Sequence, residues 1–197
     1  MPVVYFVRHC ETDFNVEQRL QGRFDTCLNA RGRQQAYAVG DVLHDLFARD
    51  ARAPGDFAYM SSPLKRACET MEILRATLGL DPQSYAIDAR LIEISYGEWE
   101  GSTLPEIEAR TPDMLAQRER DKWDFAPPGG ESYRDLTRRI SEWYAGLTRD
   151  IVVAAHGGGA RALMALFHVL PEAEATRAPI AQGVVYVFAN GTMARYA

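Results

Sequence analysis

The sequence predicts an α/β fold of three layers, with helices on both faces of a mostly parallel sheet and an antiparallel strand at one edge. Short apolar runs alternate along the chain with segments of helical periodicity. This alternation is typical of parallel strands joined by helical crossovers. Near the C-terminus, Asn190-Gly191 lies between two apolar runs and predicts a hairpin, because both residues tolerate the positive φ of a tight turn. The hairpin accounts for the antiparallel edge.

The composition indicates one globular domain, residues 1–197. Hydrophobic residues make up 47% of the chain and the formal net charge is −5. A negative chain has no general attraction for nucleic acid or an anionic membrane, so we expect neither as a partner. Cys10, Cys27 and Cys68 have neither disulfide nor zinc spacing. We therefore expect free thiols, no metal and, because the N-terminus lacks a signal core, a cytoplasmic location.

The first half of the chain begins with an apolar run at 3–7, which predicts a buried strand. A polar segment at 11–33 is long for a connection, and loops of this length tend to be functional. Apolar residues spaced three and four apart then predict a helix from 34 to about 47. The next predicted elements are a strand at 57–60, a helix at 64–78 that is capped by residues 61–63, and a short strand at 85–87.

The second half contains the segment with the weakest periodicity, residues 103–130. We interpret this segment as a small helical insertion in the single domain, with two short helices that are separated at Pro112 and lie over one end of the sheet. The remaining predicted elements are a helix at 131–147, a strand at 151–155, a helix at 160–169, and hairpin strands at 184–188 and 193–196.

Two of the predicted buried strands end directly at histidines, the first strand at His9 and the strand at 151–155 at His156. If these strands are parallel neighbours, both imidazoles lie at the carboxyl edge of the sheet, where α/β proteins bind ligands. Arg8 would join them, and so would Arg66 from the start of a helix. Arginine and helix N-termini both bind phosphate, so the cluster predicts an anion site in an acidic protein.

Simpler interpretations exist for each of these residues alone. Arg66 could be solvated, and Glu93 could be an ordinary surface carboxylate. Cysteine-dependent phosphatase chemistry requires an arginine six positions after the cysteine. Only Cys27 meets this spacing, with Arg33, and it lies in a polar segment instead of a strand-loop-helix cradle. The spacing of Cys27 and Arg33 is therefore attributed to chance.

Residues 8–12, Arg-His-Cys-Glu-Thr, resemble the Arg-His-Gly-Glu-Thr signature of the histidine phosphatase superfamily, also called phosphoglycerate mutase-like proteins. Further segments resemble the family in the family's order and span nearly the whole chain: Asn15, Gln21-Gly22, residues 62–67, residues 91–93 with 97–101, residues 129–132 and His156-Gly157-Gly158. The resemblance implies a phosphoglycerate mutase-like fold.

The resemblance also implies a role for each matching residue. His9 would be the nucleophile that accepts the phosphoryl group, and Glu93 the proton donor. Arg8, Arg66 and His156 would hold the phosphate and its transition-state charge. The other implied phosphate- or substrate-binding residues are Asn15, Gln21, Gly22 and Gly157. On independent chemical grounds, neighbouring arginines disfavour the imidazolium form and keep a histidine nucleophile neutral.

The function implied is metal-independent phosphomonoester hydrolysis through a phosphohistidine, with a small phosphorylated metabolite as substrate and no cofactor. Phosphotransfer of the phosphoglycerate mutase type is one alternative, and a non-catalytic protein that binds a phosphorylated ligand is another. The short insertion and the end of the sequence at Ala197 favour an open pocket and hydrolysis. The sequence is compatible with a monomer and with a homodimer.

The sequence departs from the family at two positions. Cys10 stands where glycine is usual, and we expect its side chain to narrow the site or to make the enzyme sensitive to oxidants. Gly159 replaces a branched residue, and we expect it to loosen a turn.

Overall fold

A computed structural model describes all 197 residues, which fold around a six-stranded sheet in the order β3-β2-β4-β1-β5-β6. Strands β3, β2, β4 and β1 are parallel to one another. Strand β5 is antiparallel to both of its neighbours, β1 and β6. The strands are β1 Val4–Arg8, β2 Ala58–Ser61, β3 Ala86–Ile87, β4 Ile151–Ala155, β5 Val185–Ala189 and β6 Thr192–Tyr196. The predicted α/β class and the antiparallel edge are confirmed.

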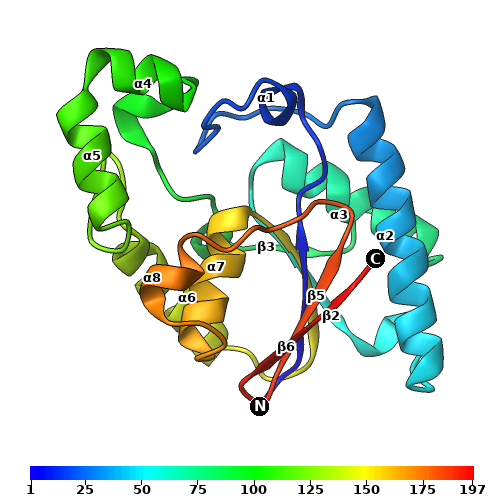
Figure 1. The fold of residues 1–197 in the computed structure, drawn as a ribbon. Coiled ribbons are helices and arrows are strands. Elements are labelled where there is room, and N and C mark those ends of the chain that lie inside the picture. The colour runs from blue at the N-terminus through cyan, green and yellow to red at the C-terminus, as the bar shows by residue number, and fades with distance from the viewer.

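Helices form a layer on each face of the sheet (Figure 1). Helices α2 (Ala30–Arg49) and α3 (Lys65–Thr77) cover one face, and α6 (Tyr133–Ala145) and α7 (Gly157–Leu166) cover the other. The alternation of side chains along a strand divides β1 between two cores: Tyr5 packs with the side chains of α2 and α3, whereas Phe6 packs with those of α6 and α7.

Short helices gather at the upper end of the sheet, where the parallel strands finish (Figure 1). Helix α1 is Asp13–Val16, and residues 103–130 hold α4 (Leu104–Arg110) and α5 (Pro112–Arg120). Thr103 caps α4 through its hydroxyl, and a new helix begins at Pro112 because proline suits a first helical turn. The remaining short elements are α8 Glu172–Ala175 and the 3-10 turns Pro54–Asp56, Ala89–Leu91 and Gly97–Trp99.

Helix α6 starts two residues later than predicted, and the starts of α2, α3 and α7 differ for identifiable reasons. The predicted loop at 11–33 contains α1 and the first turn of α2, which Asn29 caps by accepting from Gly32 N at 2.8 Å. Helix α3 begins after Leu64, whose side chain cannot cap it, and Ser62 Oγ contacts both Leu64 N at 3.4 Å and His156 Nε2 at 2.7 Å. Helix α7 starts at Gly157 and not at 160. Its first three residues are glycines of low helix propensity, but all three are buried, and tertiary packing outweighs that propensity.

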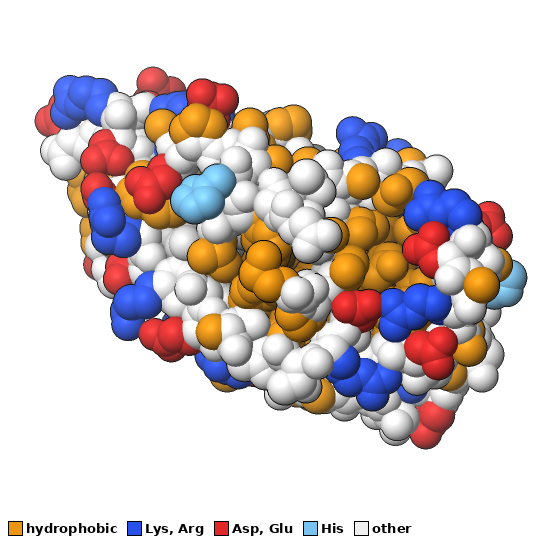
Figure 2. Space-filling model, turned by 90° about the horizontal axis from the view of Figure 1, so that it is seen from below, with side chains coloured by type: hydrophobic (Ala, Val, Ile, Leu, Met, Phe, Trp, Pro, Cys, Tyr) orange, Lys and Arg blue, Asp and Glu red, His pale blue; other side chains and the backbone are white.

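The opposite end of the molecule exposes apolar side chains. Figure 2 shows this face from below: apolar side chains gather near its centre, and charges of both signs lie around them. None of the helices combines the length and the hydropathy needed to cross a lipid bilayer.

Candidate active site

The two histidines meet because their strands are parallel neighbours. Arg8 is paired with Ala155 in the β1–β4 register, and His9 N donates to Ala155 O at 2.7 Å. His9 and His156 therefore leave the sheet side by side, with ring centroids 5.2 Å apart and exposed fractions of 2% and 1%. The predicted convergence of the two strand ends is confirmed.

The surroundings of His9 define its protonation. Its Nδ1 lies 2.8 Å from the backbone oxygen of Cys10, which can only accept, so Nδ1 carries the hydrogen and Nε2 keeps a free lone pair. Burial holds the pKa of His9 well below its ordinary value of 6.5, and the positive charges of Arg66 and Arg8 lower it further. The imidazole is neutral at neutral pH.

Two arginines flank this imidazole, Arg66 fully buried and Arg8 half-buried. Arg66 donates from Nη1 to Phe24 O at 2.6 Å and from Nη2 to Gly22 O at 2.8 Å, and Arg8 donates from Nη1 to Ile180 O at 2.6 Å. The Nε atoms of both arginines are buried without a partner in the protein. Burial lowers the pKa of Arg66 to about 10, so the group stays charged at neutral pH. The two guanidinium groups are arranged to receive an anion.

The second histidine and the carboxylate are held by neighbouring backbone and hydroxyl groups. His156 Nε2 lies 2.7 Å from Ser62 Oγ, and its Nδ1 is buried without a partner. Burial, with Arg66, holds the pKa of His156 well below 6.5. Glu93 Oε1 accepts from Ile94 N at 2.9 Å and from Gly158 N at 3.1 Å. Glu93 thus lies at the N-terminus of α7, a favourable place for a carboxylate.

A cavity of about 120 Å³ joins the predicted residues. Gln21 Oε1 accepts from the hydroxyls of Thr12 and Thr26, so the Gln21 amide N–H groups are left to donate. Arg8, His9, Asn15, Gln21, Gly22, Arg66, Glu93 and Gly157 line this cavity. His156 is not part of the lining, although its ring lies next to that of His9.

Four further residues line the cavity and were missed from the sequence: Arg19, Leu20, Tyr96 and Arg161. Arg161 donates from Nε to Ala178 O at 2.9 Å and from Nη1 to the Tyr133 hydroxyl at 3.2 Å, and no carboxylate forms an ion pair with it. Arg161 follows Gly157 by four residues, so both lie on one face of α7. A helix start at 157 in the sequence prediction would have revealed it.

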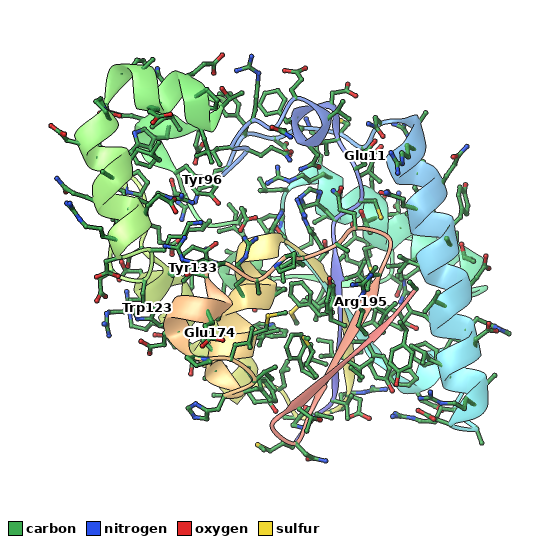
Figure 3. All side chains as sticks on the ribbon, viewed as in Figure 1. Glu11, Tyr96, Trp123, Tyr133, Glu174 and Arg195 are labelled. Carbon is green, nitrogen blue, oxygen red and sulfur yellow. The ribbon has the colours of Figure 1, made fainter.

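Basic residues at the end of α5 and directly after it continue the site beyond Tyr96. In Figure 3, Tyr96 and Tyr133 lie between α5 and α7. A smaller hollow on the other side of Tyr96 is lined in part by Arg118, Lys122 and Tyr133. Burial lowers the pKa of Lys122 to about 8, with a contribution from Arg118. Both side chains form ion pairs with Glu119, Arg118 at 2.5 Å and Lys122 at 3.8 Å, so this basic pair shares one carboxylate.

The expectations for Cys10 and Gly159 are wrong. The Cys10 side chain is absent from the cavity lining and is fully buried against Leu28 and Ala36. Burial raises the pKa of its thiol to about 11, which disfavours the reactive thiolate. Gly159 lies inside α7, where an added Cβ would meet the Phe6 ring at 3.4 Å, an ordinary contact. No group of three or more His, Cys, Asp or Glu residues is placed to hold a metal ion.

The fold and the site together define an α/β protein with a buried histidine pair and an arginine clamp for an anion. The model of the histidine phosphatase superfamily, branch 1, matches residues 4–191, and the chain belongs to this family. The family predicted from the motifs is therefore confirmed.

The similar proteins include several phosphatases. The chain is 37% identical to a glucosyl-3-phosphoglycerate phosphatase of Mycolicibacterium vanbaalenii, over 84% of this chain and 73% of the relative. It is 38% identical to the Mycobacterium tuberculosis protein of the same name, over 85% and 75%. A solved mycobacterial glucosyl-3-phosphoglycerate phosphatase in complex with VO3 superposes with a TM-score of 0.77 and 32% identity, over 95% of this chain and 92% of that one.

Proposed function

We propose that this chain is a metal-independent phosphomonoester hydrolase that works through a phosphohistidine on His9. The observation that carries the proposal is a neutral imidazole with a free Nε2, held between the guanidinium groups of Arg8 and Arg66. The phosphatases among its relatives support hydrolysis over phosphotransfer of the mutase type. The complete set of nucleophile, clamp and carboxylate disfavours a protein that only binds phosphate.

In the first step, Nε2 of His9 attacks phosphorus and the bond from phosphorus to the ester oxygen breaks. Arg8 and Arg66 neutralise the charge on the transferring group. Glu93, held at the N-terminus of α7, donates a proton to the departing alkoxide. The Asn15 and Gln21 amides, Gly22 and Gly157 complete the pocket around the phosphoryl oxygens. His156 is kept neutral by burial, and its Nδ1, which has no protein partner, is available to donate to a phosphoryl oxygen when Nε2 accepts from Ser62.

In the second step, water attacks the phosphohistidine. Glu93 now accepts the proton from this water, because the group that gave a proton to the leaving alkoxide is left as a base. The bond from phosphorus to His9 Nε2 breaks, and orthophosphate leaves with the neutral imidazole restored.

We also propose that the substrate is a small phosphorylated metabolite with a second anionic group. Arg161 lines the phosphate cavity without a carboxylate partner, and Lys122, which forms an ion pair with Glu119 at 3.8 Å, adds a second positive charge beyond Tyr96. Lys122→Met is expected to raise the KM for 3-phosphoglycerate by about tenfold, the scale of one ion pair at a partly buried site. The KM for p-nitrophenyl phosphate, which has no second charge, should change little. Equal changes for both substrates would contradict this proposal.

The proposed mechanism is tested with purified protein and p-nitrophenyl phosphate, without added metal. The wild type should release phosphate, and His9→Ala should lower kcat by roughly 10⁴-fold, the scale on which loss of a nucleophile acts. His44→Ala, on the exposed side of α2, is the matched control. Release that survives in His9→Ala would overturn the mechanism. Isomerisation of 3-phosphoglycerate without release would establish a mutase.

A cytoplasmic location is part of the proposal. Three free thiols support it, because a reducing compartment keeps cysteines unpaired. Detection of the protein in the cytosolic fraction of fractionated cells is the corresponding test.

A further inference from the structure

A segment from the far end of the chain follows the backbone of the proposed nucleophile. Residues 180–183 precede β5, which pairs with β1 in antiparallel register. Ile180 O accepts from Arg8 Nη1 at 2.6 Å, and the side chain of Gln182 donates to His9 O at 3.1 Å. The backbone of Gly183 lies near the Cys10 thiol and lowers its pKa, against the larger effect of burial. Arg8 and His9 are therefore held by a second segment, of which Gln182 is the only member that acts through a polar side chain.

The Gln182 amide group bridges two oxygens. Its Nε2 donates to His9 O at 3.1 Å and to Asn15 Oδ1 at 2.9 Å. A backbone carbonyl can only accept, so His9 O fixes which end of the Gln182 amide faces it. The backbone oxygen of His9 therefore determines which of the two amide orientations Gln182 adopts.

The same logic fixes the Asn15 amide one step further. Asn15 Oδ1 accepts from Thr12 N at 3.1 Å and from Gln182 Nε2 at 2.9 Å. The reverse orientation would turn the Asn15 NH2 group against two N–H donors. Because Asn15 also lines the cavity, its NH2 group is left to face the phosphate pocket, where no protein acceptor engages it.

We propose that Gln182 is a positioning residue, which transfers the orientation of the His9 carbonyl to the Asn15 amide so that Asn15 presents N–H donors to the phosphoryl group. The inference rests on the proposed function, because it assigns the cavity to a phosphoryl group. A residue at 182 that cannot donate leaves the Asn15 oxygen held by Thr12 alone, through its N–H and its hydroxyl, so that the amide turns its oxygen toward the phosphate more readily. That oxygen would repel the phosphoryl oxygens.

The test is a double-mutant cycle read by the binding of inorganic phosphate in titration calorimetry. Gln182→Met keeps the length of the side chain but removes the donor, and is expected to weaken phosphate binding about 5- to 20-fold, the scale of one hydrogen bond to a charged group. Asn15→Ala should weaken it by a similar factor. In the Asn15→Ala background, Gln182→Met should change binding less than twofold.

A role of Gln182 in packing alone predicts a different result. It would lower the thermal midpoint and weaken phosphate binding equally in both backgrounds, and such additivity would overturn the proposal. Unchanged binding in Gln182→Met would overturn it too. Gln182→Leu supplies a second neutral replacement if the first variant folds poorly.

Failure of the proposed function is read separately. If the wild type binds phosphate but releases none from p-nitrophenyl phosphate, the hydrolase proposal fails, and the cycle still decides the role of Gln182. If the wild type hydrolyses the ester and the cycle is additive, only the positioning role fails.

Discussion

Desolvation acts on two adjacent residues with opposite consequences for their reactivity. Burial favours the neutral form of any ionisable group. For His9 the neutral form is the nucleophile, so a lowered pKa keeps it reactive. For Cys10 the neutral form is the inert thiol, and its pKa is raised to about 11. Burial thus keeps the His9 imidazole nucleophilic and keeps the neighbouring Cys10 thiol unreactive.

We expect Cys10 to be protected from oxidants and alkylating agents. Brief treatment with iodoacetamide should label the exposed Cys27 first, and peptide mass spectrometry can locate the label. Cys10→Ala should leave the peroxide sensitivity of phosphate release unchanged. Modification of Cys10 in the folded protein at a rate similar to that of Cys27 would contradict the burial argument.

At the level of the element, the first turn of α7 explains why successive glycines have different roles. Gly157 lines the cavity, whereas a Cβ at Gly158 would lie 2.4 Å from Glu93 Oε1. A Cβ at Gly159 would make only an ordinary contact with the Phe6 ring. The glycine at 158 is therefore required by the carboxylate, and the glycine at 159 is not.

Gly158→Ala is expected to displace the Glu93 carboxylate and to lower kcat for alkyl phosphates by about 10²-fold, the lower range for loss of a general acid. p-Nitrophenyl phosphate should be less affected, because p-nitrophenolate leaves with little need for a proton. The matched variant Gly159→Ala should retain activity. It should raise the free energy of unfolding by up to about 1 kcal/mol, the difference in helix propensity. Equal kinetic losses in both variants would argue against a specific role of Gly158.

At the level of the whole molecule, one end of the sheet carries two buried, neutral histidines together with the charged side chains of Arg8 and Arg66. His9 and His156 both have a pKa held well below 6.5, by burial first and by Arg66 second. In the unfolded chain both imidazoles regain an ordinary pKa near 6.5. The arrangement that prepares the site therefore makes folding depend on pH.

The free energy of unfolding is expected to fall as the pH is lowered below about 6.5. In that range the unfolded chain binds protons that the native protein excludes, so protonation favours unfolding. Carboxylates with a lowered pKa, such as Asp150, lose their stabilising effect only below their ordinary value of 3.8. Urea unfolding at about pH 7 and about pH 5 measures the decline. The decline should be shallower in His156→Gln, and an equal slope would contradict the assignment.

Much of the site could be predicted from the sequence because its members are attached to recognisable local features. Arg8 and His9 end an apolar strand, His156 ends another, and Arg66 lies in the first turn of a helix. Glu93 was found only through its motif, since no periodicity marks it. The start of α7 was misplaced because glycine has low helix propensity, although burial outweighs that propensity here. The same misplaced start hid the position of Arg161 on the face of α7 that lines the cavity.

The sequence by itself determined the family, the α/β class and the strand ends that carry the histidines, because these follow from apolar periodicity and from motifs within short windows. Only the tertiary structure decided the burial of Cys10, the proximity of Tyr96 to Arg118 and Lys122, and the contact of Gln182 with His9 and Asn15. That contact spans 173 positions and depends on the pairing of β1 with β5. Hydrogen bonds between such distant segments leave no local pattern, since they exist only when the register of the sheet brings the segments together.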